Sequence, residues 1–376
     1  MGESNFFEKA DLATRKKVEF VMKYFGIYFR IVCSTLKNGT SRIPNIIYID
    51  PFSGPGIYDD GYESVPIKLL KFIRNQGIEN IRFIFNDIEY SGKLKENIHK
   101  NIHLLPNVNS ITILDKDANL IDFSSYFTPK DVVISYVDPF SYTRVDPLTI
   151  KQLTNNAFSD SLFFLNIQYF YRFIEVDADN LKSFFGNLDI YSRVKQSIKN
   201  DTREQSTNLL IHEYANALTK NSNRFILPIF FKKSHKETQI FNAILLVSKC
   251  KTGLDRIKEY ICGEEHFFIE DGRFIIYESS YSQIEEFDIF NSREESILQH
   301  IPKTDFINCD KLIEIIDKHF IVTYGYISAY NPKYVKKVLS DLEDNKQIMI
   351  RHDGKRNRIK RNGINTYGEN TFFKKE

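Results

Sequence analysis

Acidic side chains close several short apolar runs in the first half of the chain. The runs at 45–50, 81–87, 110–115 and 132–138 end in Asp50, Asp87, Asp115 and Asp138. Ligands of open α/β sheets bind beyond the carboxyl ends of the strands. We therefore expect these carboxylates to line one rim, where they can accept hydrogen bonds from a bound ligand.

The segment I-D-P-F-S-G-P-G at 49–56 is the sharpest local feature. Glycines at 54 and 56 allow a tight bend and a close approach of the backbone to a ligand. A dinucleotide fingerprint needs a third glycine and an acid about 20 residues further on. Ile57 and Tyr58 follow instead, and Asp87 lies 33 residues beyond Gly54, so a nicotinamide cofactor is disfavoured. A tight turn without a ligand remains the alternative.

The sequence predicts no metal site. His99 and His103 are four residues apart, but Lys100 replaces the glutamate of H-E-x-x-H and no third ligand is placed. The four cysteines form no C-x-x-C pair. Neither a G-x-S-x-G elbow nor a phosphate-binding G-x-x-x-x-G-K-[ST] loop occurs, which argues against a hydrolase of that type and against nucleotide hydrolysis.

The elements that must position these residues alternate between strand and helix patterns. A fifth apolar run spans 161–167, and crossover helices are expected at 65–76, 90–104 and 146–157. An amphipathic helix is expected at 15–36. A polar, helix-prone insert at about 171–220 precedes two strands, 224–231 and 240–249, that read as a hairpin. This order predicts an α/β, Rossmann-like domain over 1–290.

The last part of the chain, 291–376, predicts a winged-helix domain. Ser292 and Glu295 form a capping box, helices are expected at 309–320 and 331–345, and a hairpin follows them. Residues 333–376 contain 12 Lys+Arg and 6 Asp+Glu, a net of 12 − 6 = +6, so residues 1–332 carry 2 − 6 = −4. Such clustering predicts binding of a nucleic acid, DNA or RNA, with a solvated wing or an acidic protein partner as alternatives. The basic side chains concerned are Lys333, Lys336, Lys337, Arg351, Lys355, Arg356, Arg358, Lys360 and Arg361.

Composition agrees with a folded protein outside the membrane. Hydrophobic residues make up 42% and charged residues 27%, close to the globular average. No apolar run approaches the ~18 residues of a membrane span, and the first residues lack the apolar core of a secretory signal. A cytoplasmic location is the expectation.

Taken together, these motifs resemble the three-Cys-motif partner (TcmP) family, a class I methyltransferase-like family. The resemblance covers about residues 15–376. It rests on the order and spacing of IDPFSGPG, DGYESVP, FNDIE, DKDAN, YVDPF, LPIFFKK, FNAILLVSK and GLDRIKEYI. It implies a mostly parallel, seven-stranded methyltransferase sheet, the cofactor S-adenosylmethionine, a three-cysteine-motif partner protein and a place in a phage-defence or mobile-element system.

The family pattern, carried over residue by residue, implies a cofactor site. It assigns Asp50, Phe52, Gly54 and Gly56 to the loop under the methionine end of the cofactor. Lys17 would reach the cofactor carboxylate, and a solvated lysine is the alternative. Asp87, or else Glu89, would hold the ribose hydroxyls, and Asp117 with Asn119 would face the adenine. Solvated helix caps are the alternative for these acids.

Asp138-Pro139-Phe140 resembles the D/N-P-P-Y/F loop of amine methyltransferases. In that loop the acid orients an acceptor amine and the aromatic side chain stacks on a flipped base. Here Phe140 occupies the second proline position, so the stacking ring would be Phe140 or Tyr142. An Asp138 that caps a helix or touches only the cofactor is the alternative.

Two functions therefore stay open. The first is a methyltransferase that uses S-adenosylmethionine and modifies a nucleic acid. The second is a non-catalytic, nucleotide- or nucleic-acid-binding component of a complex with the same fold.

Overall fold

The computed structural model describes most of the chain. The described residues are 9–37, 45–78, 80–101, 110–139, 145–156, 158–185, 187–219, 222–234, 237, 239–262, 267–278, 295–354, 360–361 and 364–376. They group into two compact units. The first contains residues 1–199, 220–224 and 244–249, and the second contains 200–219, 225–243 and 250–376. The predicted boundary near residue 290 lies outside the described residues.

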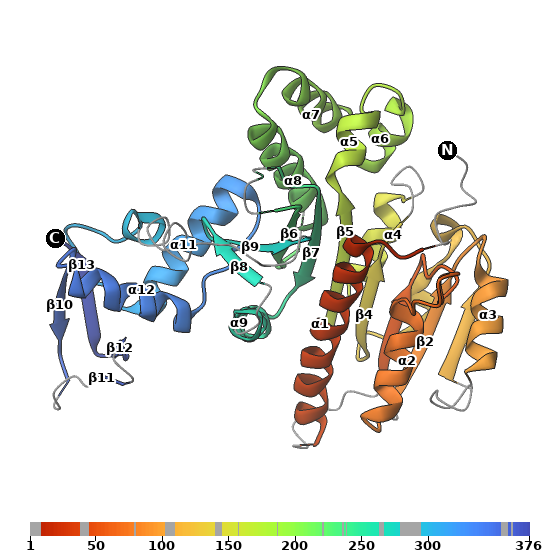
Figure 1. Ribbon diagram of the computed structural model, residues 1–376, viewed down its shortest axis with the longest axis horizontal. Coiled ribbons are helices and arrows are strands. Elements are labelled where there is room, and N and C mark those ends of the chain that lie inside the picture. The colour runs from red at the N-terminus through yellow and green to blue at the C-terminus, as the bar shows by residue number, and fades with distance from the viewer. Residues whose placement is uncertain are drawn as a thin grey trace. The chain divides into compact units, whose positions relative to one another are not determined.

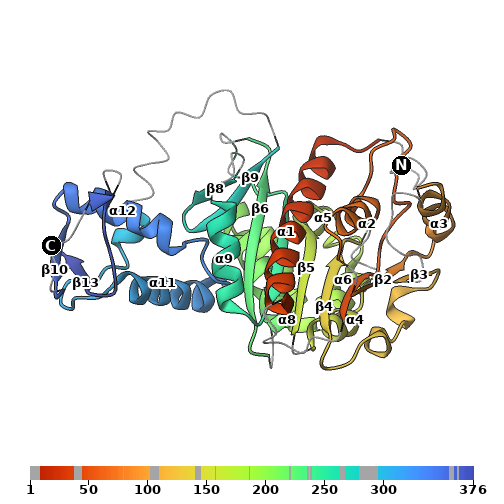
Figure 2. The ribbon, with the colours of Figure 1, turned by 90° about the horizontal axis from the view of Figure 1, so that it is seen from below.

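A parallel sheet forms the centre of the first unit. Its strands are β1 (Ile46–Asp50), β2 (Ile81–Asn86), β3 (Ile111–Leu114), β4 (Val132–Val137) and β5 (Phe158–Asn166). They follow the order β3-β2-β1-β4-β5, and each printed pair among them is parallel. Figure 2 shows β5, β4, β2 and β3 in this succession. The chain therefore reverses its direction of winding between β1 and β4, as doubly wound, Rossmann-like sheets do.

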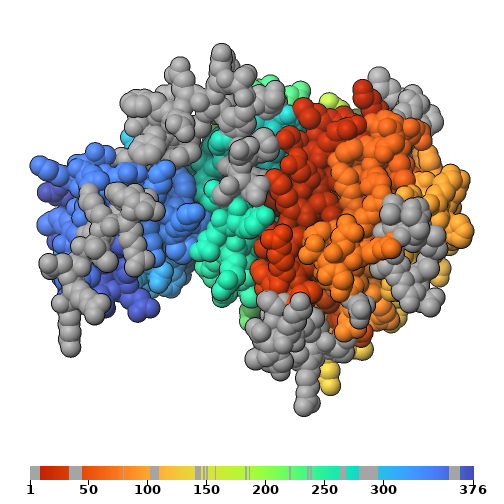
Figure 3. Space-filling view, turned by 60° about the horizontal axis from the view of Figure 1, so that its bottom comes forward, coloured from red at the N-terminus to blue at the C-terminus, as the bar shows by residue number. Residues whose placement is uncertain are grey.

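Helices cover this sheet and explain the continuous apolar strands. Every residue of β1 and of β4 is buried, which is the pattern of a strand covered on both faces. The covering helices include α1 (Leu12–Lys37), α2 (Val65–Asn75), α3 (Ser91–Lys100) and α4 (Pro147–Thr154). α1 and α2 pack side by side (Figure 1), and their outer surfaces adjoin in red and orange in Figure 3.

Aromatic side chains hold α1 on the sheet. Phe25 meets Tyr48 of β1 edge to face at 5.4 Å between ring centroids, and Phe29 meets Phe72 of α2 at 6.3 Å. All of these rings except Phe72 are at most 1% exposed. Such pairs contribute about 0.5–1.5 kcal/mol each beyond the burial of their area. They hold the middle of α1 against β1 and α2.

The predicted insert is observed as a run of helices. It comprises α5 (Ile167–Phe173), α6 (Ala178–Phe185), α7 (Leu188–Asn200) and α8 (Arg203–Thr219), after which β6 (Phe225–Lys232) and β7 (Asn242–Ser248) follow. The whole sheet has nine strands in the order β3-β2-β1-β4-β5-β7-β6-β9-β8. The prediction of seven strands was therefore too low.

The two missed strands form a hairpin in the second unit. After α9 (Lys251–Ile261), β8 (Phe267–Glu270) and β9 (Arg273–Tyr277) pair antiparallel. Asp271 and Gly272 join them with φ of 43° and 72°. An Asp-Gly pair between apolar residues is a strong hairpin signal, because both turn positions need positive φ. The sequence carried this signal, but each strand is too short for its apolar pattern to stand out.

The C-terminal elements follow the predicted order. α11 (Cys309–Tyr324) and α12 (Pro332–Asp344) confirm two predicted helices, and the Asn331 side chain caps α12 by accepting from Tyr334 N. β10 (Ile348–His352) pairs antiparallel with β13 (Thr371–Lys375), and a small pair, β11 (Lys360–Arg361) with β12 (Ile364–Asn365), lies between them in sequence. The capping serine predicted at 292 lies outside the described residues. No helix among the described residues is long and apolar enough to cross a membrane.

Candidate functional site

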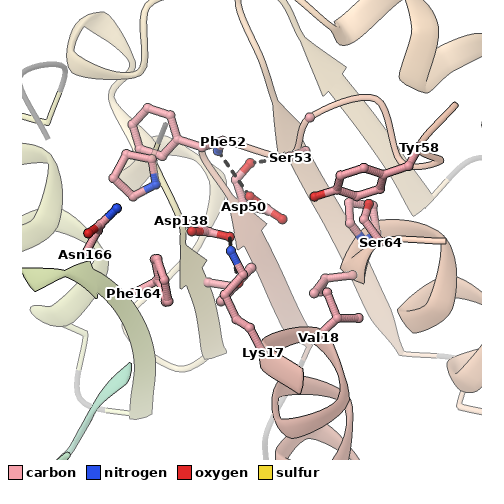
Figure 4. A pocket seen from close by; sticks show the side chains of 15 residues that line it. Lys17, Val18, Asp50, Phe52, Ser53, Tyr58, Ser64, Asp138, Phe164 and Asn166 are labelled. Atoms are coloured by element: carbon pink, nitrogen blue, oxygen red, sulfur yellow. Dashed lines mark hydrogen bonds and ion pairs between the residues drawn. The ribbon is translucent and has the colours of Figure 1, made fainter. Parts of the chain in front are cut away.

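A cavity of about 110 Å³ lies in the first unit at the carboxyl ends of β1, β4 and β5. Figure 4 shows its side chains, with Lys17 of α1 reaching towards Asp138 and with Phe164 and Asn166 on the side opposite Tyr58 and Ser64. Fifteen residues line it: Lys17, Val18, Asp50, Phe52, Ser53, Gly54, Tyr58, Ser64, Val65, Pro66, Tyr136, Asp138, Pro139, Phe164 and Asn166.

The loop after β1 is held in one shape by hydrogen bonds to β2. Ser53 N donates to Asn86 O at 2.9 Å, and Ser53 Oγ donates to Asp50 O at 2.9 Å. The Asn86 amide group donates to Pro51 O and to Lys116 O. Gly54 has φ of 63°, a conformation that suits glycine, and its backbone lines the cavity.

Gly56 serves packing. Its φ is 79°, and a Cβ at this position would lie 2.7 Å from Leu94 Cδ1. It does not line the cavity, unlike the other three residues of the predicted loop, Asp50, Phe52 and Gly54. The second glycine is thus explained by the contact between the loop and α3.

Asp50 is a buried carboxyl group that faces the cavity. Its residue is 1% exposed, and its oxygens accept from Phe52 N at 3.1 Å and from Tyr48 OH at 3.4 Å. Burial raises the pKa of this carboxyl group well above its ordinary value, and the nearby charges of Asp138 and Asp87 raise it further, against the lowering effect of the Phe52 N–H. A cation placed beside Asp50 would favour its ionised form.

Asp138 is joined to Lys17 across the cavity. Lys17 Nζ donates to Asp138 Oδ2 at 2.6 Å, and Tyr136 OH donates to the same oxygen at 2.9 Å. The side chains of Lys17 and Asp138 are 12% and 21% exposed. Lys17 Nζ also lies 4.2 Å from the centroid of the Phe164 ring. The cavity therefore holds one cation between a carboxylate and an aromatic face, a strong contact at low exposure.

Asp87 holds the backbone and is not brought to the cavity. It is 6% exposed and accepts from Gly54 N at 2.9 Å, from Glu89 N at 2.9 Å and from Tyr90 N at 2.8 Å. A carboxylate has about four acceptor sites, and three of them are engaged. Asp87 thus holds three backbone groups, and the ribose role of Asp87, or of the exposed Glu89, stays a prediction.

Asp117 and Asn119 also make local structural contacts. Asp117 caps the short helix η4 (Ala118–Leu120) by accepting from Asn119 N at 3.0 Å. Asn119 Oδ1 accepts from Asp146 N at 2.7 Å and from Thr149 Oγ1 at 3.1 Å, which ties η4 to α4. Neither lines the cavity. The alternative interpretation of these residues as caps fits the geometry.

The predicted catalytic segment is only partly described. Asp138 and Pro139 line the cavity, whereas Phe140 and Tyr142 lie outside the described residues. In the described part of the chain, no cluster of three or more His, Cys, Asp or Glu side chains could hold a metal ion.

Sequence reasoning missed several cavity residues. Tyr136 lies on β4, two residues before Asp138, and Phe164 and Asn166 lie at the carboxyl end of β5. The rule that singled out the acids at strand ends would also have found Asn166 if it had included polar residues other than acids. Tyr58 gave no such signal, because it reaches the cavity from the loop before α2.

The basic residues of the second unit are described only in part. Lys333 and Lys337 of α12 and Arg351 of β10 are exposed, and Lys336 is half-buried. Lys355, Arg356 and Arg358 lie outside the described residues, and for Lys360 and Arg361 only the backbone strand β11 is described.

Comparisons with known proteins find distant structural similarity. No family model and no curated protein matches the chain. A solved protein from Legionella pneumophila strain Philadelphia 1 is 11% identical over 59% of this chain and 82% of its own, with a TM-score of 0.34. The methyltransferase domain of bacterial CtHen1 is 11% identical over 60% of this chain and 99% of its own, with a TM-score of 0.31. Magnesium protoporphyrin IX methyltransferase from Synechocystis with bound S-adenosylmethionine is 11% identical over 66% of this chain and 89% of its own, with a TM-score of 0.30. These values are too low to carry a functional inference.

Proposed function

We propose that this protein is a methyltransferase that uses S-adenosylmethionine and modifies a nucleic acid, with an exocyclic base amine as the acceptor. One observation carries the proposal. Two carboxyl groups, Asp50 and Asp138, and the ammonium group of Lys17 face one cavity at the carboxyl ends of β1 and β4. This is the place where doubly wound sheets bind ligands, beside the point at which the strand order reverses.

The charges of the cavity suit the methionine end of the cofactor. That end carries a carboxylate, an ammonium group and a sulfonium, from which the cofactor supplies its methyl group. Lys17 is the cation in the lining that can pair with a carboxylate, and Asp50 is a buried acceptor suited to an ammonium group. The backbone of Gly54 gives the close approach that a bound amino-acid moiety needs.

The adenosine end would extend beyond the cavity towards β2 and β3. Glu89 is exposed after β2 and can accept from the ribose hydroxyls. Ile88 and Leu120 are 57% and 82% exposed after neighbouring strands, β2 and β3. Apolar side chains at this rim suit the faces of an adenine ring.

Asp138 would orient the acceptor. Methyl transfer by direct displacement needs alignment of the acceptor nitrogen with the methyl carbon more than it needs a strong base. Asp138 Oδ2 now accepts from Lys17. Pairing of Lys17 with the cofactor carboxylate would leave this oxygen to accept a hydrogen from the amine. Asp138 then keeps its Tyr136 bond, which holds the carboxylate in place.

Calorimetric titration with S-adenosylmethionine tests the cofactor site. We expect saturable binding at one site and at least a tenfold loss of affinity in Lys17→Met, because one charge-assisted contact is lost. Lys16→Met is the matched control, since Lys16 neighbours Lys17 on α1 and pairs with Glu19 at 3.8 Å. Absence of binding in a folded, ligand-free protein would overturn the proposal.

A non-catalytic binding component is the second candidate, and a specific observation favours it. Lys17 and Tyr136 both engage Asp138, and three backbone N–H groups engage Asp87, so both acids have structural partners. A binding component would tolerate Asp138→Asn without loss of its activity in the complex.

The C-terminal elements support a nucleic-acid partner. α11, α12 and the β10–β13 hairpin have the order of a winged helix, and exposed lysines of α12 provide positive charge. The three-cysteine-motif partner and a place in phage defence or in a mobile element remain part of the proposal through the family resemblance only.

A further inference from the structure

The small sheet of the second unit has an outer face that combines rings and cations. Ile307 forms an isolated antiparallel bridge with Phe373 and so joins the segment before α11 to β13. In the β10–β13 register, Met349 lies opposite Lys374 and Arg351 lies opposite Phe372. Residues that lie opposite one another share a face, and so do residues two apart on a strand. These four side chains therefore share one face.

The other face of this sheet is committed to the core. Phe373 is 0% exposed and packs against Tyr367 at 6.0 Å between ring centroids, and Ile348 is 5% exposed. Alternation along the strands then leaves Met349 and Arg351 on the outside, where they are exposed. The partly buried Phe306 and Phe372 remain accessible at this outer face.

The Arg351 guanidinium group lies over two rings. Its guanidinium carbon is 4.9 Å from the centroid of Phe306 and 5.1 Å from that of Phe372. Its Nε also pairs with Asp353 Oδ1 at 3.2 Å. Lys374 Nζ is 5.1 Å from the centroid of Phe306. These contacts restrain the planar guanidinium group of Arg351, so less conformational entropy is lost when a base stacks on it.

We propose that this Arg351–Phe306–Phe372 face, with Lys374, binds single-stranded nucleic acid by base stacking. Bases stack on aromatic rings and on guanidinium planes only where they are not enclosed in a duplex. Lys374 and the net charge of +6 over residues 333–376 match the phosphate backbone. Cations on the face do not suit a basic or purely apolar protein partner. The inference rests on the proposed function and names its substrate as a single strand.

Fluorescence anisotropy with the full chain tests this inference. The probes are a labelled single-stranded oligonucleotide of mixed sequence and the same sequence annealed to its complement. We expect the single strand to bind at least tenfold more tightly than the duplex at equal salt. Equal or tighter binding of the duplex, or no binding of either probe, would overturn the inference.

Matched variants locate the binding face. Phe372→Leu keeps an apolar side chain and removes the ring, and Arg351→Lys keeps the charge and removes the planar group. We expect each to weaken binding of the single strand by about fivefold to 100-fold, the range for loss of one stacked base. As the control, Lys346→Gln removes one charge from the exposed turn after α12. We expect it to weaken binding of the single strand by about twofold.

The result can be separated from the cofactor test. Calorimetric binding of S-adenosylmethionine is expected to be unchanged in Phe372→Leu and Arg351→Lys, and circular dichroism of both variants should match the parent protein. If both variants bind the single strand as the parent does, this face is not the binding site, even where cofactor binding succeeds.

Discussion

The two halves of the strand rim in the first unit contain the same residue types but differ in what those residues do. Beyond β1 and β4, Asp50 and Asp138 face a cavity and a lysine. Beyond β2 and β3, Asp87 and Asp117 accept hydrogen bonds from nearby backbone N–H groups. The first half therefore presents charged side chains to a cavity, and the second mainly holds loops.

This difference shows that position at a strand end is not enough to assign a ligand contact. A carboxylate that accepts several backbone N–H bonds would lose them on turning to a ligand, at a cost of about 1.5–3 kcal/mol for each charged bond. The hydrogen-bond partners of an acid therefore decide between a binding role and a structural one.

Asp138→Asn should give the largest effect, on the cavity side of the comparison. The amide cannot offer the same charged acceptor, so we expect methyl transfer to fall by about 100-fold to 1,000-fold, by analogy with loss of one oriented catalytic hydrogen bond. Affinity for S-adenosylmethionine should change by less than about threefold. Transfer of labelled methyl groups to single-stranded oligonucleotides measures the activity, and calorimetry measures the affinity for S-adenosylmethionine.

The control for this change is Asp122→Asn, at an exposed cap that accepts from Ser124 N. It should leave transfer unaltered. Full activity of Asp138→Asn would show that the acid does not orient the acceptor.

Asp87→Asn should act on stability and not on the cofactor contact. Asn has one acceptor oxygen where three backbone N–H groups now meet a carboxylate, so we expect a loss of about 2–4 kcal/mol in the free energy of unfolding. Denaturant unfolding measures it. The exposed neighbour Glu89→Gln should change stability by less than about 0.5 kcal/mol. A stable Asp87→Asn variant that fails to bind the cofactor would instead support the ribose role.

Cofactor affinity should rise with pH because of Asp50. In the free protein, burial raises the pKa of Asp50 well above its ordinary value, and a bound ammonium group would lower it again. Binding then releases a proton below the raised pKa, and affinity increases by up to about tenfold per pH unit until the free carboxyl group ionises. Calorimetry in buffers of different ionisation enthalpy counts the proton. Proton uptake on binding would contradict the role of Asp50 as the acceptor of the ammonium group. So would affinity of the parent protein that does not depend on pH, together with normal binding by Asp50→Asn.

Asp117→Ala should have the smallest effect. The change removes the cap of η4, and we expect this loss to lower the free energy of unfolding by about 1 kcal/mol. We expect the affinity for the cofactor to stay within about twofold of the parent value. Thermal unfolding and calorimetry measure the two quantities. A tenfold loss of affinity without a loss of stability would instead place Asp117 at the adenine.

Much of the fold was predictable from local patterns. The continuous apolar runs of β1 and β4 are buried along their whole length, and the spacing of apolar residues predicted α1 and α12. The β8–β9 hairpin was missed, although its Asp-Gly turn is visible in the sequence, because strands of four and five residues show little periodicity.

The sequence by itself determined which polar side chains stand at the ends of strands, because strand alternation and chain order are local properties. Only the tertiary structure decided which of them meet. Asp87 binds the amide of a residue 33 positions away, and Lys17 reaches Asp138 across 121 positions. Such partners come together through the packing of α1 on the sheet and the winding of the strands, so a pattern confined to neighbouring residues could not distinguish the cavity-facing acid from the acid that holds the loop.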